Sequence, residues 1–146
     1  MIIPDVNVLL NAYNASSARH SVLRRWWEDT LSGDRPVGLP WAVTLGFIRI
    51  ATNPRAWLDP MPVADAIQHV RAWMAQPAVE IIGPGDRHAD ILFRLLESAG
   101  TAANLTSDAH LAALAIEYQA EIATTDLDFG RFTGLRWFNP ARKATS

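Results

Sequence analysis

Residues 1–10 of the chain read MIIPDVNVLL, an apolar run that contains a single carboxylate, that of Asp5. Asp is seldom buried unless it is paired or bound to a metal ion, so its position in this run needs a physical explanation. In one interpretation, residues 2–4 form a strand and the Asp5 side chain caps the following helix by accepting from its backbone N–H groups. In the other, Asp5 is a ligand, because functional groups in open α/β sheets collect just beyond the carboxyl ends of strands. The ten residues are compatible with both.

The composition of the 146-residue chain is that of one soluble globular domain, with 49% apolar and 19% charged residues. No apolar run approaches the ~20 residues that a membrane span needs. We therefore expect a single domain over residues 1–140, a loose tail over 141–146 and no membrane association. The lack of a secretory signal favours a cytoplasmic location. The absence of Cys excludes disulfide frameworks, thiolate zinc sites, iron–sulfur clusters and Cys nucleophiles.

The remainder of the chain alternates strand and helix patterns. Apolar residues at helical spacing predict five helices. The first starts after Ser16 or Ser17 and ends at Gly33, and the next two span 41–52 and 63–74. The fourth follows Asp86 and ends at Gly100, and the fifth follows Thr106 or Ser107 and reaches Glu117. Short apolar runs predict strands over 2–4, 36–39, 79–82, 121–125 and, at an edge, 135–138. This alternation predicts an α/β fold, a three-layer α/β/α sandwich around a mostly parallel sheet. Pro4 fits a central strand only as its last residue.

Four carboxylates stand at chemically suggestive places: Asp5 after the first strand, Asp108 at a helix start, and Asp126 and Asp128 after a late strand. Taken singly, Asp108 could complement the positive end of its helix, and Asp126 and Asp128 could form a solvated turn. Taken together, carboxylates at neighbouring strand ends repel one another unless a cation neutralises them. An all-Asp donor set suits hard cations such as Mg²⁺ or Mn²⁺.

Competing chemistries lack their signatures. The chain has no phosphate-binding P-loop, no dinucleotide fingerprint and no nucleophile elbow. Haloacid-dehalogenase-like phosphatases and receiver domains need a core Lys, whereas the one Lys here is Lys143 in the tail. The net charge of −2 argues against a protein that binds nucleic acid through a basic charge over its whole surface. It is compatible with a local basic patch that binds nucleic acid. The four His residues show no paired zinc spacing, and we expect a surface or structural role for His110.

Three segments carry a resemblance to a known family. Asp5-Val6-Asn7, the helix start from Asp108 to Ala115 and the segment from Thr124 to Phe129 resemble the PIN-domain family, specifically its VapC-type toxins. The segment from Thr52 to Arg55 is similar to a subgroup of these toxins. The similarity extends from Ile2 to about Pro140.

The resemblance implies an Mg²⁺- or Mn²⁺-dependent endoribonuclease, the toxin of a toxin–antitoxin pair, usually homodimeric and silenced by its antitoxin. Asp5, Asp108 and Asp126 would take the metal-binding and catalytic positions, with Asp128 as an accessory ligand. Asn7 and Thr124 would be the supporting polar residues. The metal would activate a water and neutralise the scissile phosphate.

One departure from the family concerns the helix 41–52. The family usually carries a further acidic residue there, whereas this helix contains no Asp or Glu and Gly46 takes the aligned position. Helical spacing puts Gly46 near Arg49. Gly46 therefore marks either tight packing against the first strand or a missing ligand. The second possibility supports an alternative function, a catalytically weakened PIN-like module that binds RNA or a partner.

The tryptophans suggest a protein partner. The helix with Trp26 and Trp27 and the helix 41–52 carry more apolar surface than one small sheet can cover. We expect a homodimer and an apolar groove for an antitoxin segment.

Overall fold

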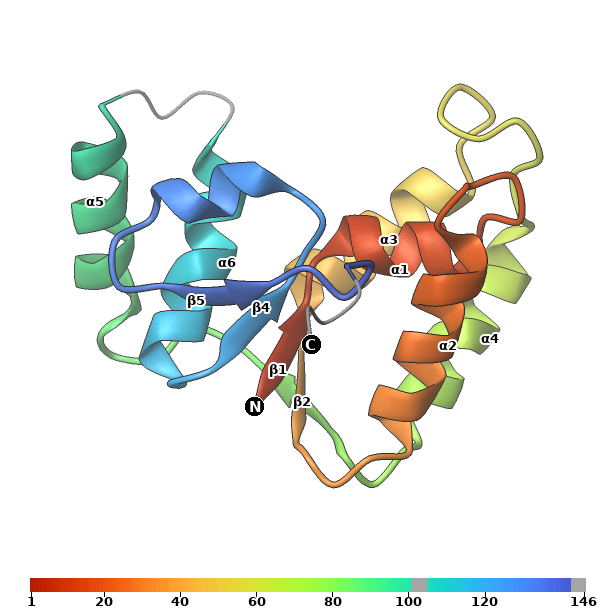
Figure 1. Cartoon of the computed structure of the whole chain (residues 1–146), viewed down its shortest axis with the longest axis horizontal. Helices are drawn as coiled ribbons and strands as arrows, with labels where there is room; N and C mark the ends of the chain where they lie inside the picture. The colour runs from red at the N-terminus through yellow and green to blue at the C-terminus, as the bar shows by residue number, and fades with distance from the viewer. Residues whose placement is uncertain (101–104, 143–146) are drawn as a thin grey trace.

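The protein folds around a five-stranded sheet in which all neighbouring strands are parallel (Figure 1). The computed structural model describes residues 1–100 and 105–142. The strands are β1 (Ile2–Pro4), β2 (Val37–Pro40), β3 (Val79–Ile82), β4 (Glu121–Ala123) and β5 (Arg136–Phe138), in the spatial order β3-β2-β1-β4-β5. The first strand of the chain is therefore the central one. Pro4 is its last residue, as predicted, so its missing N–H interrupts no later ladder bond.

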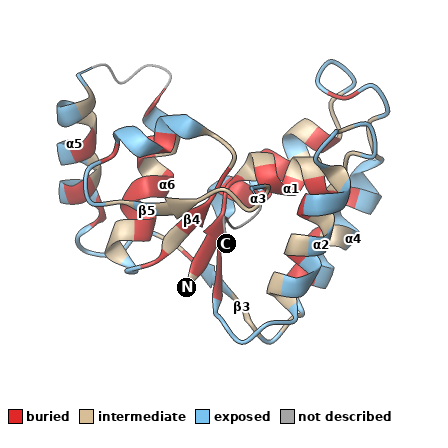
Figure 2. Ribbon diagram, viewed as in Figure 1, coloured by how far each residue is buried: buried red, intermediate tan, exposed pale blue. Residues whose placement is uncertain are grey.

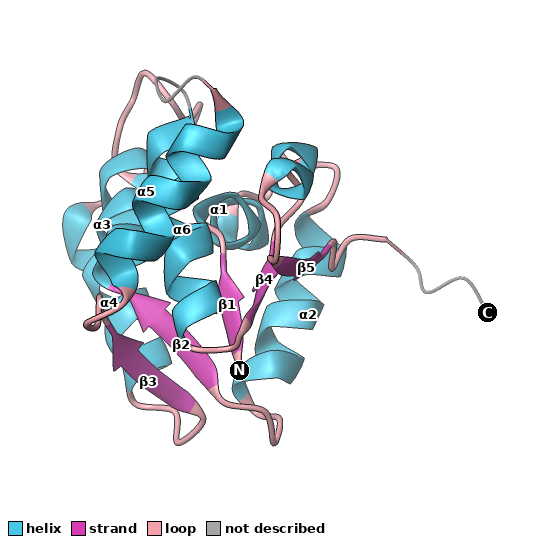
Figure 3. Ribbon diagram, turned by 90° about the vertical axis from the view of Figure 1, so that its left-hand side faces the viewer, coloured by secondary structure: helices cyan, strands magenta, loops and turns pink. Residues whose placement is uncertain are grey.

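Helices lie on both sides of this sheet (Figure 3). They are α1 (Val6–Tyr13), α2 (His20–Leu31), α3 (Trp41–Ala51), α4 (Val63–Met74), α5 (His88–Ala99) and α6 (Thr106–Glu117), with a short 3-10 helix, η2 (Leu127–Arg131). The predicted three-layer α/β/α class is confirmed. No helix within residues 1–100 and 105–142 is both long and apolar enough to cross a membrane.

An aromatic cluster holds the helices on the α1 side together. The rings of Trp27 and Trp73 meet edge to face with their centroids 5.6 Å apart, and Phe47 lies 4.8 Å from Trp73. The indole N–H of Trp73 donates a 2.8 Å hydrogen bond to the hydroxyl of Tyr13. Because these residues belong to α1, α2, α3 and α4, the cluster fixes the positions of α1 and α3.

Helix α6 is buried along most of its length (Figure 2). Residue Ala109 and residues 111–115 are all buried, and α6 packs against α5 and β4. Four of these six side chains are Ala, which permits the close packing. The helix that carries Asp108 is therefore packed firmly against the rest of the fold from Ala109 onward.

Several predicted boundaries differ from the structure. Helix α2 starts at His20 rather than after Ser16 or Ser17, because the Ser17 hydroxyl accepts from Arg19 N in a separate turn. Thr106 and Ser107 are the first residues of α6, and its N-cap is Leu105. Strand β4 ends at Ala123 rather than at residue 125, and the short helix η2 begins directly after Asp126. Gly100 ends α5 in the left-handed conformation, φ 76°, as predicted.

Two segments of the predicted arrangement fall partly outside the described residues. Between the helix predicted to end at Gly100 and the helix predicted to follow Thr106 or Ser107, only Leu105 of residues 101–105 is described. Of the tail predicted over 141–146, Ala141 packs against the core and its N–H donates to Asn139 Oδ1 at 2.9 Å. Residues 143–146, with Lys143, lie outside the described part.

Candidate active site

The site begins at the carboxyl ends of β1 and β4. The two strands pair in register, with Pro4 opposite Ala123, and Asp5 N donates to Ala123 O at 2.9 Å. The residues that follow the strands, Asp5 and Thr124, are therefore neighbours although 119 positions separate them in the sequence. Parallel strands bring their carboxyl ends to one edge, which is why this edge collects functional groups.

Asp5 uses both of its carboxylate oxygens in hydrogen bonds. Val6 N donates to Oδ1 at 2.7 Å, and the Thr124 hydroxyl donates to Oδ2 at 2.8 Å. Asp5 is the N-cap of α1, so the capping interpretation is confirmed. Only 7% of the residue is exposed, and burial raises the pKa of its carboxyl above the usual range despite these two bonds.

Thr124 is fully buried and links the acidic residues to one another. Besides donating to Asp5, its hydroxyl oxygen accepts from Asp126 N at 3.0 Å and from Asn7 Nδ2 at 3.4 Å. The Asn7 Oδ1 in turn accepts from Thr125 N at 3.5 Å. Asn7 and Thr124 thus position the turn that carries Asp126.

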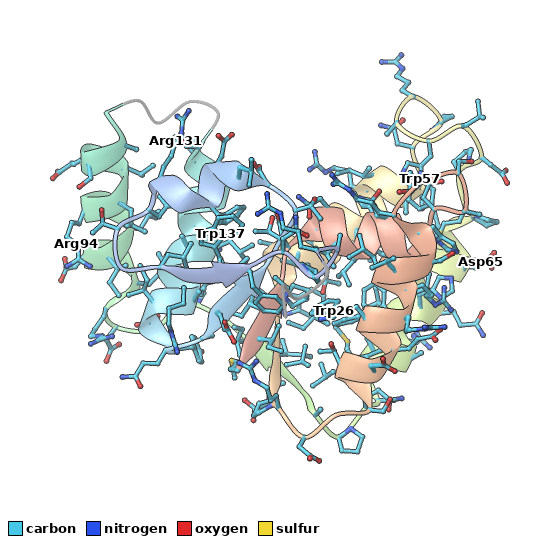
Figure 4. The ribbon with its side chains drawn as sticks, viewed as in Figure 1. Trp26, Trp57, Asp65, Arg94, Arg131 and Trp137 are labelled. Atoms are coloured by element: carbon cyan, nitrogen blue, oxygen red, sulfur yellow. The ribbon has the colours of Figure 1, made fainter. Side chains whose placement is uncertain are left out.

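Asp126 and Asp128 belong to a turn on the outside of the site. The Asp126 Oδ1 caps η2 by accepting from Asp128 N at 2.9 Å. Asp128 is exposed and lies 3.6 Å from the guanidinium of Arg131, which projects outward from η2 (Figure 4). The predicted solvated turn is therefore present at these two residues.

Asp108 is the carboxylate whose ionisation the site perturbs most clearly. Burial at the start of α6, followed by repulsion from Asp5, Asp126 and Asp128, raises the pKa of Asp108 from 3.8 to about 6. No hydrogen bond to its carboxyl is found within the described residues. The fold thus brings Asp5, Asp126 and Asp128 close enough to Asp108 for their charges to act on its carboxyl.

The four carboxylates do not form a closed metal cage. Within residues 1–100 and 105–142, no group of three or more Asp, Glu or His side chains is close enough to hold a metal ion. The donor chemistry nevertheless fits a hydrated Mg²⁺ or Mn²⁺, because Mg²⁺ keeps several waters and is commonly held by one or two carboxylates. The carboxylate oxygens of Asp108 accept no hydrogen bond within the described residues, so Asp108 is the one of the four that is best placed to bind a cation.

A pocket of about 300 Å³ opens between α3 and α6, with Asp5 and Val6 at one side. Asp5 and Asp108 line it, together with Gly46 and Arg49 from α3 and His110 from α6. Asn7, Thr124, Asp126 and Asp128 do not line it, although Asp126 and Asp128 act on Asp108 electrostatically. The remaining lining residues are Ala42, Val43, Thr106, Ser107 and Leu111.

Gly46 is buried at the place where α3 crosses α1. A Cβ at this position would lie 3.2 Å from Val6 Cγ2, which is tighter than an ordinary van der Waals contact. The close approach is therefore to the first residue of α1, rather than to the first strand as the packing alternative held. Because Gly46 also lines the pocket, tight packing and room for a ligand coexist at this position.

Sequence reasoning missed the contact between His88 and His110. The Nε2 of His88 lies 3.0 Å from the Nδ1 of His110, and His88 is 7% exposed. Burial and the neighbouring His88 lower the pKa of His110. In the structure His110 is half-buried and forms part of the pocket wall. Because 22 positions separate it from His88 in the sequence, no local motif could have predicted their contact.

Comparisons with known proteins agree with this arrangement. A family model described as the PIN domain matches residues 2–135. Ribonuclease VapC33 of Mycobacterium tuberculosis is 47% identical over 143 residues, covering 98% of this chain and 100% of the relative. Ribonuclease VapC37 of the same organism is 48% identical over 140 residues, 96% of this chain and 97% of the relative.

Solved structures share the fold at lower identity. Mycobacterium tuberculosis VapC20, described as a Sarcin-Ricin loop cleaving toxin, matches with a TM-score of 0.67 at 19% identity, over 93% of this chain and 99% of that one. A chain of VapBC2 from Rickettsia felis, bound to a promoter DNA fragment, matches with a TM-score of 0.69 at 17% identity, over 95% and 98% of the two chains.

Proposed function

The chain belongs to the PIN domain family, in its VapC-type branch, and from this membership we propose that it is a metal-dependent endoribonuclease, the toxin component of a toxin–antitoxin pair. Its substrate would be RNA, its domain residues 1–140 and its location the cytoplasm. The observation that carries the proposal is the position of Asp108 in the pocket beside Asp5, where burial, followed by repulsion from Asp5, Asp126 and Asp128, raises its pKa to about 6. Perturbed carboxylates that face a pocket are characteristic of catalytic sites.

The cofactor in this proposal is Mg²⁺ or Mn²⁺, held by Asp5, Asp108 and Asp126 with Asp128 as an accessory. When bound, such a cation supplies an activated water and neutralises charge on the scissile phosphate. The chain's own residues fix the geometry. Val6 N and the Thr124 hydroxyl orient Asp5, while Thr124 and Asn7 hold the turn that bears Asp126. No protein nucleophile is required.

Partners follow from the family and from the surface. The relatives include chains solved as VapBC complexes, which supports a cognate antitoxin. Four large apolar side chains on neighbouring helices are at least 39% exposed: Trp41, Leu45, Val63 and Ile67. These residues support a homodimer or an antitoxin groove formed by α3 and α4. Trp27 contributes nothing to it, because its side chain is fully buried.

Cleavage of structured RNA by purified protein, freed of antitoxin, tests the nuclease proposal. We expect cleavage with Mn²⁺, none with EDTA, and a loss of about 10²-fold or more in Asp5→Asn, Asp108→Asn and Asp126→Asn, because each loses an anionic ligand. Asp128→Asn should be milder. The matched control is Asp65→Asn, an exposed residue of α4 on the side of the molecule away from η2 (Figure 4).

Wild-type rates in the three site variants would refute the nuclease assignment. The alternative, a PIN-like binding module with weakened catalysis, is favoured by the lack of a three-carboxylate group within the described residues and by Gly46 in place of an acid. That module would bind RNA or a partner protein but leave the RNA intact in Mn²⁺.

A further inference from the structure

Arg49 is a cation on the wall of an otherwise acidic pocket. It lines the pocket with Asp5 and Asp108, yet it takes part in none of the ion pairs found within the described residues, which join Arg24 to Glu28, Arg35 to Glu121 and Arg131 to Asp128. Its guanidinium is therefore available to a ligand. Arg binds phosphate through a planar fork of N–H donors.

An anionic ligand needs such a cation. Asp5 and Asp108 would repel a phosphodiester, and this repulsion opposes binding wherever both are ionised. A basic residue on the facing wall offsets it and orients the ligand. The start of α6, at Thr106, adds the positive end of a helix dipole to the same pocket.

The His88–His110 contact determines which nitrogen of His110 can donate. One ring must donate across the 3.0 Å contact between His88 Nε2 and His110 Nδ1. The other ring nitrogen of His88, Nδ1, is buried and has no hydrogen-bond partner within the described residues. A proton there would leave a buried N–H orphaned, which proteins avoid more strictly than an unsatisfied acceptor.

The favoured arrangement therefore places the His88 proton on Nε2, which donates to His110 Nδ1. His110 then carries its own proton on Nε2, the ring nitrogen that His88 does not occupy. His110 lines the pocket, and with its Nδ1 occupied by His88, Nε2 is the ring nitrogen that it has left to offer a ligand.

We propose that Arg49 and the Nε2–H of His110 form a phosphate-binding subsite in this pocket, which holds an RNA phosphate beside Asp5 and Asp108. Arg49 supplies charge from α3 and His110 supplies a neutral donor from α6. The inference rests on the proposed function only in taking RNA as the ligand, since the subsite recognises the phosphodiester and no base.

Binding of a short fluorescein-labelled single-stranded RNA in EDTA isolates the subsite from cleavage. We expect Arg49→Ala to weaken binding about tenfold or more, since a hydrogen bond to a charged group contributes about 1.5–3 kcal/mol. The slope of log Kd against log salt should also fall by about 0.7, one phosphate contact on a single strand. Arg71→Ala, which removes an equal charge from the exposed side of α4 outside the pocket, should change neither quantity.

The role of His110 as a hydrogen-bond donor is tested with two substitutions, one that removes the N–H donor and one that keeps it. His110→Phe should weaken binding about tenfold, whereas His110→Gln, which retains an N–H donor, should stay within about threefold of wild type. Should His110→Phe fail to fold, ¹⁵N NMR of the wild-type imidazoles at about pH 8, above the ordinary His pKa of about 6.5, decides the point. We expect the His110 proton on Nε2.

Two results would overturn the subsite. One is equal loss of affinity in Arg49→Ala and Arg71→Ala, or a wild-type Kd weaker than about 100 µM, the weak end of non-specific binding. The other is a His110 proton on Nδ1. Failure of the nuclease proposal is distinguishable, because wild-type protein would then leave RNA uncut in Mn²⁺ while Arg49-dependent binding in EDTA persisted.

Discussion

At the scale of single residues, Asp5, directly after β1, and Asp108, in the first turn of α6, line one pocket. Local patterns could locate both residues, because strand ends and helix starts have sequence signals, and Asn7 and Thr124 were named with them as supporting polar residues. Arg49 could be placed near Gly46 by helical spacing, but its lack of an ion pair depends on the whole surface. The contact of His88 with His110 depends on how α5 packs against α6, which no local pattern encodes.

The raised pKa of Asp108 predicts a pH dependence of stability. Its carboxyl has a pKa near 6 when folded and near 3.8 when unfolded, so the folded state binds more protons between these values. The contribution of Asp108 to the free energy of unfolding is therefore fully present below about pH 4 and is lost as the pH rises through 6. Asp108→Asn should match the metal-free wild type at about pH 4 and exceed it in unfolding free energy by about 1–2 kcal/mol at pH 7, after allowance for solvent screening.

Thermal unfolding at a series of pH values measures this difference. A divalent cation should raise the melting temperature of the wild type more than that of Asp108→Asn, because it relieves the same repulsion. Asp5→Asn should gain less stability, since both Asp5 oxygens accept hydrogen bonds in the fold. A difference between Asp108→Asn and wild type that stayed constant from pH 4 to 7 would contradict the coupling.

At the scale of elements, periodicity predicted helices well where polar and apolar faces alternate, as in α4 and α5, and it also gave the bounds of the largely apolar α3 to within one residue. It gave no bounds for α1, whose eight residues are mostly apolar apart from Asn7 and Asn11. The start of α2 was misplaced by two or three residues, because Ser17 serves a turn and contacts Asn11 rather than capping the helix. Side-chain hydrogen bonds of this kind decide helix ends, and they depend on neighbours far from the helix pattern.

The crossing of α1 and α3 at Gly46 predicts how that position responds to substitution. Gly46→Glu adds a carboxylate beside Asp5 and Asp108, so the Mn²⁺ concentration that half-activates cleavage should fall, and the RNA that is cut should not change. Gly46→Gln is the matched control, because it has the same contact with Val6 without the charge. Titrating Mn²⁺ against cleavage rate for the three proteins makes the measurement.

Folding must be checked alongside the titration. The 3.2 Å approach of a Cβ to Val6 opposes the gain of about 1 kcal/mol that a helix makes when Gly is replaced by Ala. Melting temperatures of Gly46→Glu and Gly46→Gln that both collapsed, or equal half-activating concentrations in a folded Gly46→Glu and the wild type, would identify Gly46 as a packing residue only.

At the scale of the whole molecule, the alternation of strands and helices was enough to predict a parallel sheet between two helical layers. The strand order β3-β2-β1-β4-β5 was not predictable in the same way, since it is set by contacts between distant segments. The exposed side chains of Trp41, Leu45, Val63 and Ile67 are also a property of the assembled surface.

That surface predicts the oligomeric state. We expect a dimer in light scattering at micromolar concentration, and a monomer for Trp41→Glu and Leu45→Glu, because a charge at an apolar interface lacks a partner. Phe93→Glu on α5, where Phe93 is as exposed as Leu45 at 58%, should remain dimeric. A monomeric wild type, or a Phe93→Glu variant that dissociates as the α3 variants do, would argue against an interface on α3.

The central position of β1 has a consequence for the time course of synthesis. This strand is synthesised before its neighbour β4, and the hydroxyl that orients Asp5 follows 119 residues later, in Thr124. At about 5–20 residues per second, roughly ten seconds of translation separate the two halves of the site. A nascent chain therefore carries no assembled acidic cluster until Thr124 and Asp126 have been added, so the site forms in one step rather than gradually.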